Sequence, residues 1–205
     1  MNICWKPTHS TLPVVALLLM AGCAMQPTAP PPATQWQTYQ DRAASLTHWD
    51  LSAKVALRWR GGAENASLIW SQADDRSEVD LSGPLGAGAV RITQQDDRLD
   101  VTRGGERSTY NSSTPDTLAA ATGWPIPVNA LPFWLRGLPD PDQPIERLSL
   151  QDGRAEEIRQ GGWTISYTAY APAGIGSLPA KLRITHAADN ISLRLVNARW
   201  TLQDR

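Results

Sequence analysis

The sequence has few of the residues that carry catalytic or metal chemistry. Its 205 residues include two cysteines, three histidines and a single phenylalanine. Beyond residue 22, His48 and His186 lie far apart and lack the His-x-x-x-His or Cys-plus-His spacing of zinc sites. The chain also has no G-x-S-x-G motif, phosphate-binding glycine loop or dinucleotide fingerprint. We therefore expect a protein that is not an enzyme, with no catalytic residues, no metal and no cofactor.

Neither sign of charge dominates the chain. The chain has nineteen Lys and Arg residues and twenty Asp and Glu residues, which gives a formal net charge of -1. A block of like charge that would attract a polyanion is missing. This balance disfavours a nucleic-acid partner, and we expect none.

The first 22 residues have the organisation of a secretory signal peptide. The apolar run TLPVVALLLMAG, from Thr11 to Gly22, is shorter than the roughly 20 residues that span a bilayer. It ends in LLLMAGC, which resembles the bacterial lipobox, a motif whose cysteine is lipidated and becomes the first mature residue. Cys23 is therefore the expected lipid attachment site. The alternative is an ordinary signal peptide with a nearby thiol.

Residues 23–35 are expected to form a lipidated, proline-rich tether. Their Pro, Ala and Thr content favours extended conformers and cannot bury a core. Ala24 rather than Asp follows the cysteine, which in the sorting system that the lipobox resembles implies delivery to the outer membrane. Residues 36–205 are then one domain, long enough for a substantial core.

Alternation of apolar and polar side chains runs through most of this domain. The segment WDLSAKVALRW, residues 49–59, predicts a strand with one wet face, and similar segments follow between short turns. Short connections make the strands antiparallel. Helical spacing predicts helices at residues 36–46, 113–123 and 131–138. The pattern is typical of a mainly β fold, a curved sheet or barrel with short helices packed at its mouth or interior.

Tryptophan is the abundant large side chain, with eight copies after residue 23. Such residues either fill a core or line a cavity suited to acyl chains. From the alternation, the candidate cavity residues are Trp59, Leu68, Trp70, Trp134, Leu135 and Trp163.

The chain resembles the LolB family of outer-membrane lipoprotein receptors in four stretches, WDLSAKVAL, SGPLGAGAVRI, TGWPIPVNALPFWLRGLPDP and LPAKLRIT…ISLRLVNARW. The resemblance implies an incompletely closed antiparallel β-barrel of about eleven strands, with short helices covering an apolar cavity, in a monomer. It also implies a receptor that accepts acylated lipoproteins from the soluble periplasmic carrier LolA. The receptor would insert them into the inner leaflet of the outer membrane without nucleotide hydrolysis.

The same resemblance gives a role to the loop SGPLGAG. The family's leucine at the place of Leu85, here between Pro84 and Gly86, acts in handing cargo to the membrane. Burying one leucine gives only about 1.5–3 kcal/mol, too little to anchor a protein. We therefore expect Leu85 to orient the cavity mouth at the bilayer while the lipid on Cys23 holds the chain. The alternative is that Leu85 folds back onto its own domain.

A positively charged rim that docks LolA is a further implication, with Arg58 and Arg60 as candidate contacts. Two other functions remain open from the sequence. One is a structural outer-membrane lipoprotein that scaffolds an envelope assembly through exposed strand edges. The other is a hydrolase of lipid or envelope polymer, which the missing nucleophile and metal motifs disfavour.

Overall fold

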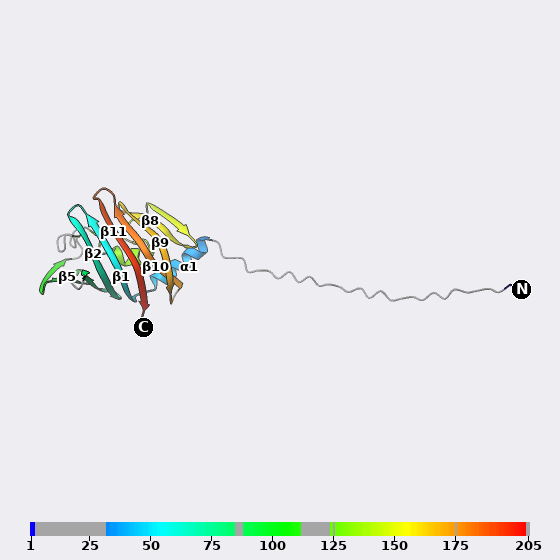
Figure 1. Cartoon of the computed structure of the whole chain (residues 1–205), viewed down its shortest axis with the longest axis horizontal. Helices are drawn as coiled ribbons and strands as arrows, with labels where there is room; N and C mark the ends of the chain where they lie inside the picture. The colour runs from blue at the N-terminus through cyan, green and yellow to red at the C-terminus, as the bar shows by residue number, and fades with distance from the viewer. Residues whose placement is uncertain (3–31, 85–87, 112–123, 125, 175, 204–205) are drawn as a thin grey trace.

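The computed structural model describes residues 1–2, 32–84, 88–111, 124, 126–174 and 176–203. Cys23, Leu85 and Gly86 lie outside these residues, as does the helix predicted at 113–123. The described chain forms eleven strands and two helices (Figure 1). The helices are α1 (Pro32–Ala44) and α3 (Leu131–Leu135). The strands are β1 (His48–Trp59), β2 (Gly62–Ala73), β3 (Arg76–Ser82), β4 (Val90–Gln95), β5 (Arg98–Arg103), β6 (Glu106–Asn111), β7 (Arg147–Gln151), β8 (Arg154–Gln160), β9 (Trp163–Ala173), β10 (Gly176–His186) and β11 (Ile191–Leu202).

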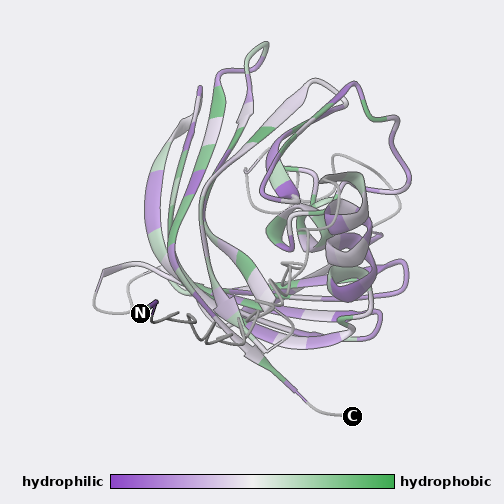
Figure 2. Ribbon diagram, turned by 90° about the vertical axis from the view of Figure 1, so that its right-hand side faces the viewer, coloured by the Kyte–Doolittle hydropathy of each residue, from purple (hydrophilic) through white to green (hydrophobic). Residues whose placement is uncertain are grey.

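All eleven strands belong to one antiparallel sheet, in the order β6-β5-β4-β3-β2-β1-β11-β10-β9-β8-β7. The central pairing joins β1 to β11, so the first and last strands of the chain meet in the middle. The sheet curves around the helices (Figure 2). Its edge strands β6 and β7 do not pair with each other. The prediction of a mainly β, incompletely closed antiparallel barrel is therefore confirmed.

Alternation along β1 places its apolar side chains on the concave face. Trp49 and Leu51 are fully buried there, while Ser52 and Lys54 are exposed on the convex face. This row continues across the sheet, because antiparallel register sets like-facing residues of neighbouring strands opposite each other. Leu51, for example, lies between Trp70 of β2 and Trp200 of β11.

The strand order gives the barrel two ends. The connections after β1, β3, β5, β8 and β10 lie at one end, here called the loop end, and it includes the connection that contains Leu85. The connections after β2, β4, β7 and β9 lie at the other end. Helix α1 begins near this second end, since Gly153 in the β7–β8 turn lies against Gln35. We call it the tether end.

Helix α1 begins at Pro32, four residues before the predicted start and inside the segment assigned to the tether. Proline is favoured in the first turn of a helix because its missing N–H would be unpaired there anyway. The predicted apolar stripe does face inward: Trp36 and Ala43 are buried, and Tyr39 packs against the core.

Arg136 fastens α1 to α3. Its guanidinium donates hydrogen bonds to the carbonyls of Ala43 and Leu46 at the end of α1, at 2.9 and 2.8 Å, and to the carbonyl of Pro132 at 2.9 Å. The hydroxyl of Tyr39 donates back to the Arg136 carbonyl at 2.6 Å. These bonds pair carbonyls that a helix end leaves without intrahelical partners.

Gly137 ends α3 in a conformation that disfavours other residues. Its φ is +76°, and a Cβ at this position would lie 2.6 Å from the Tyr39 hydroxyl. The close approach of α1 to α3 therefore depends on a missing side chain.

Candidate functional site

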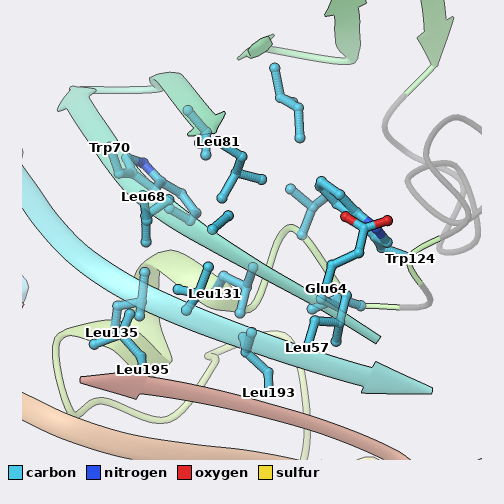
Figure 3. A pocket seen from close by; sticks show the side chains of 16 residues that line it. Leu57, Glu64, Leu68, Trp70, Leu81, Trp124, Leu131, Leu135, Leu193 and Leu195 are labelled. Atoms are coloured by element: carbon cyan, nitrogen blue, oxygen red, sulfur yellow. The ribbon is translucent and has the colours of Figure 1, made fainter. Parts of the chain in front are cut away.

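An apolar cavity lies on the concave face between the sheet and the segment that contains α3 (Figure 3). Fifteen of its sixteen lining residues are apolar, and the exception is Glu64. The lining residues are Val55, Leu57, Glu64, Ala66, Leu68, Trp70, Val79, Leu81, Ile92, Trp124, Ile126, Val128, Leu131, Leu135, Leu193 and Leu195.

The floor of the cavity follows directly from strand register. Val55 and Leu57 of β1 pair with Leu195 and Leu193 of β11, so four branched side chains form one patch. Leu68 pairs with Leu81 across the β2–β3 ladder and extends the patch sideways. Because residues two apart share a face, the apolar alternation of these strands produces a continuous apolar floor.

The segment 126–135 forms a cover over this floor. Ile126, Leu131 and Leu135 are buried against the core, while Val128 is half-buried. The Asn129 side chain accepts a hydrogen bond from the Gln94 amide at 2.9 Å, which ties the cover to β4. The cavity is thus closed partly by a short segment rather than by the sheet.

The free space in the cavity is about 90 Å³. An apolar cavity of about 150 Å³ holds a molecule the size of benzene, so the space is far too small for even one long acyl chain. Any such ligand must displace part of the cover. The sheet floor is held by strand ladders on both sides, whereas the half-buried stretch around Val128 has fewer buried contacts to lose.

Three of the six residues predicted to line the cavity do line it. Leu68 and Trp70 project from β2, and Leu135 projects from α3 (Figure 3). The alternation placed the β2 pair on the concave face, where the cavity is.

The other three, Trp59, Trp134 and Trp163, lie elsewhere. Trp134 is fully buried, donates to the Gln160 side chain at 3.2 Å and packs on Trp163 at 5.9 Å between ring centroids. Trp59 lies over the β1–β2 turn, against Gly61 and Gly62. Periodicity predicted which face of the chain these rings occupy, but not which neighbour they contact.

Sequence reasoning missed the cover residues Trp124, Ile126 and Val128. They fall between the two helices predicted at 113–123 and 131–138, where no helix or strand was expected. Their spacing of two is the signal that would have found them, because it sets three apolar side chains on one side of an extended segment.

The candidate carrier contacts lie at the loop end. Arg58 and Arg60 are both exposed, and Arg58 belongs to the convex row of β1, which faces away from the cavity. Arg60 donates to the carbonyl of Ala188 at 2.9 Å and so joins the β1–β2 and β10–β11 turns. Pro84, the described residue of the predicted membrane loop, is exposed at the same end.

The buried polar groups near α3 serve structure rather than reaction chemistry. Burial raises the pKa of the Tyr39, Tyr167 and Tyr170 hydroxyls, so these phenols stay neutral. Tyr167 donates to the carbonyl of Trp134 at 2.8 Å, and Tyr170 donates to that of Ala155 at 2.7 Å. Among the described residues, His, Cys, Asp and Glu nowhere gather in threes in a way that could hold a metal ion. Across those same residues, no helix has the length and apolar character needed to cross a membrane.

The fold and the cavity define a class, the open antiparallel half-barrel that encloses apolar space under helical cover. The fold is similar to that of a LolA superfamily protein from Nitrosomonas europaea, with a TM-score of 0.53, 10% identity, and coverage of 86% of this chain and 96% of that chain.

Sequence comparison identifies the family within this class. The family model described as outer membrane lipoprotein LolB matches residues 47–200. The outer-membrane lipoprotein LolB of Alkalilimnicola ehrlichii is 36% identical over 191 residues, 92% of this chain and 94% of the relative. That of Chromohalobacter salexigens is 33% identical over 195 residues, 93% and 89% of the two chains. The chain therefore belongs to the LolB family of outer-membrane lipoproteins, and no catalytic family is among these matches.

Proposed function

We propose that this protein is the outer-membrane receptor that takes acylated lipoproteins from the periplasmic carrier LolA and inserts them into the inner leaflet of the outer membrane. The observation that carries the proposal is the cavity, with fifteen apolar lining residues beneath a cover, in a member of the LolB family. It acts as a monomer, without nucleotide hydrolysis.

The physical need for such a cavity follows from the size of an acyl chain. Each buried methylene contributes about 0.8 kcal/mol, so a sixteen-carbon chain exposed to water costs on the order of 10 kcal/mol. A lipoprotein with three chains would not leave a carrier unaided. A second apolar site accepts the chains without a free aqueous intermediate, and transfer runs forward if that site holds them more favourably.

The remaining sites belong to the same proposal. The lipid on Cys23 anchors the chain, and the loop with Pro84, Leu85 and Gly86 meets the bilayer at the loop end. Arg58 and Arg60, exposed at that end, contact the carrier. Cargo then enters and leaves at the same end of the barrel.

A transfer assay with purified components tests the proposal. LolA loaded with a triacylated lipoprotein is mixed with this protein in liposomes, and cargo on each component is measured over time. We expect the parent to take cargo and insert it. Leu85→Glu should accept cargo normally but insert it at least about tenfold more slowly, because burying the leucine contributes about 1.5–3 kcal/mol. Leu85→Met, which stays apolar, is the matched control.

One result would contradict the receptor function, and another would contradict only the role of Leu85. A parent that removes no cargo from LolA contradicts the receptor function and favours the scaffold alternative. Equal insertion by Leu85→Glu and the parent removes Leu85 from the mechanism while leaving the receptor function in place.

A further inference from the structure

On strands β2 and β5, the row of side chains that faces the concave side is apolar and then ends in a charged residue near the loop end. On β2 the inward row runs Trp70, Leu68 and Ala66, and the next inward residue is Glu64. On β5 the buried Leu99 and Val101 are followed two residues later by Arg103. Both charged residues are exposed at the rim of the concave face. At the loop end, the apolar rows of the concave face therefore end in one acid on β2, which also lines the cavity, and one base on β5.

These two side chains share a space with Trp124. The Arg103 guanidinium carbon lies 5.8 Å from the centroid of the Trp124 ring, and that ring also lines the apolar cavity. Glu64, Arg103 and Trp124 border an adjoining hollow of about 330 Å³. Figure 3 shows Glu64 beside Trp124 at the edge of the apolar side chains. The hollow is continuous in its lining with the cavity.

Neither charge is neutralised by a neighbour in the described part of the chain. Glu106 lies opposite Arg103 in the β5–β6 ladder, yet the two form no ion pair, and Glu64 has none either. Asp100, the acid on the same strand as Arg103, faces the opposite side of β5 and is engaged with Arg98 and Arg107. The donors of Arg103 and the oxygens of Glu64 are thus available to a ligand.

An acylated cysteine has the matching chemistry. Its chains are joined to the peptide by ester and amide groups, which cannot enter an apolar cavity without losing hydrogen bonds. Ester carbonyls only accept, and a guanidinium only donates; a carboxylate only accepts, and the first peptide amides of the cargo donate. A neutral linkage with both kinds of group suits one acid beside one base.

Resting on the proposed function, we propose that Arg103 and Glu64 bind the polar linkage of the acylated cysteine while its chains fill the cavity. Trp124 holds the guanidinium at the boundary between the two regions. Both residues attract the neutral linkage, whereas for the phosphate of a phospholipid, which has acyl chains of the same kind, repulsion by Glu64 offsets attraction by Arg103. The rim thereby selects lipoprotein over membrane lipid.

Binding measurements on the full mature chain test this selection. The ligands are a tripalmitoylated cysteinyl peptide, a pyrene-labelled alkane without the linkage, and dipalmitoyl phosphatidic acid. Arg103→Met should weaken peptide binding at least about tenfold, as expected for lost charge-assisted hydrogen bonds, and alkane binding less than about twofold. Glu64→Lys should weaken peptide binding and strengthen phosphatidic acid binding. Arg183→Met, on the convex face of β10, is the matched control and should change neither.

The outcomes distinguish failure of linkage recognition at the rim from failure of the proposed receptor function. If the parent binds the peptide and Arg103→Met binds it equally well, the rim does not recognise the linkage. Equal loss for peptide and alkane overturns the inference in the same way, because it assigns the residue to packing. A parent that binds no peptide at all contradicts the proposed function itself. Arg103→Lys and Glu64→Gln provide milder variants should either substitution impair folding.

Discussion

Asp100 shows at the residue scale how charge is organised away from the cavity. It lies on the side of β5 opposite Leu99 and Val101, yet it is only 7% exposed, because Arg98 and Arg107 close over it at 2.9 and 3.3 Å. The hydrogen bond from Arg98, followed by that from Thr109, lowers the pKa of the Asp100 carboxyl to about 2. The ionised form is therefore the one that the fold stabilises.

The stabilising effect of Asp100 depends on pH in a defined direction. An unfolded aspartate has a pKa of about 3.9, which is higher than the folded value. Ionisation of Asp100 therefore stabilises the folded chain. The contribution is fully present above pH ~4 and is lost as pH falls towards 2. Asp100→Asn should therefore lower the free energy of unfolding at pH 7, and the difference from the parent should shrink below pH ~4 and disappear as pH falls through 2. Urea unfolding across this range measures it; a difference independent of pH would contradict the assignment.

At the scale of elements, the junction of α1 with α3 fixes one end of the cover. Arg136 is 8% exposed and its donors are used by carbonyls of both helices, while burial lowers the pKa of its guanidinium. Gln160, fully buried in β8, accepts from Trp134 and donates to the carbonyls of Asp140 and Gln143 at 2.9 Å each. The end of the cover near α3 is thus held by buried hydrogen bonds, whereas Val128 is only half-buried.

Arg136→Met should loosen this junction. Removing hydrogen bonds from a charged donor costs about 1.5–3 kcal/mol, so the free energy of unfolding should fall by about that amount. Amide hydrogen exchange at residues 131–138 should accelerate. Arg42→Met, an exposed substitution in the last turn of α1, is the control and should have little effect. An equal loss in the two variants would show that Arg136 acts through general charge rather than through these bonds.

The elements also show what could be predicted from the sequence. The strands and their antiparallel pairing follow from alternation and short turns, and alternation alone placed Leu68 and Trp70 on the concave face. Helical spacing treated Trp134 and Leu135 as one face, yet Leu135 lines the cavity and Trp134 contacts Gln160. That division depends on how α3 is docked, and the docking depends on Arg136 and Gln160, which lie 24 residues apart in sequence. Local periodicity carries no information on such contacts.

At the scale of the whole molecule, the proposed anchor and the proposed membrane loop leave the barrel at opposite ends. Helix α1 starts near the tether end, and the β3–β4 connection lies at the loop end. The twelve residues of β1 span about 40 Å, while residues 23–31 reach at most about 30 Å when extended. With Cys23 lipidated as proposed, the loop therefore meets the bilayer only when the strands are inclined to it rather than upright.

The free space of about 90 Å³ in the cavity has room for no acyl chain, so the proposed function requires chains to enter between the sheet and the cover. A tripalmitoylated peptide with brominated chains tests this directly, because bromine quenches the fluorescence of tryptophans that it contacts. We expect the peptide to quench the parent, and most of that quenching to disappear in the double variant Trp70→Phe, Trp124→Phe, since both rings line the cavity. Trp36→Phe, on α1 and outside the cavity lining, should leave it unchanged. Unquenched parent fluorescence, or quenching that survives the double substitution, would contradict the account.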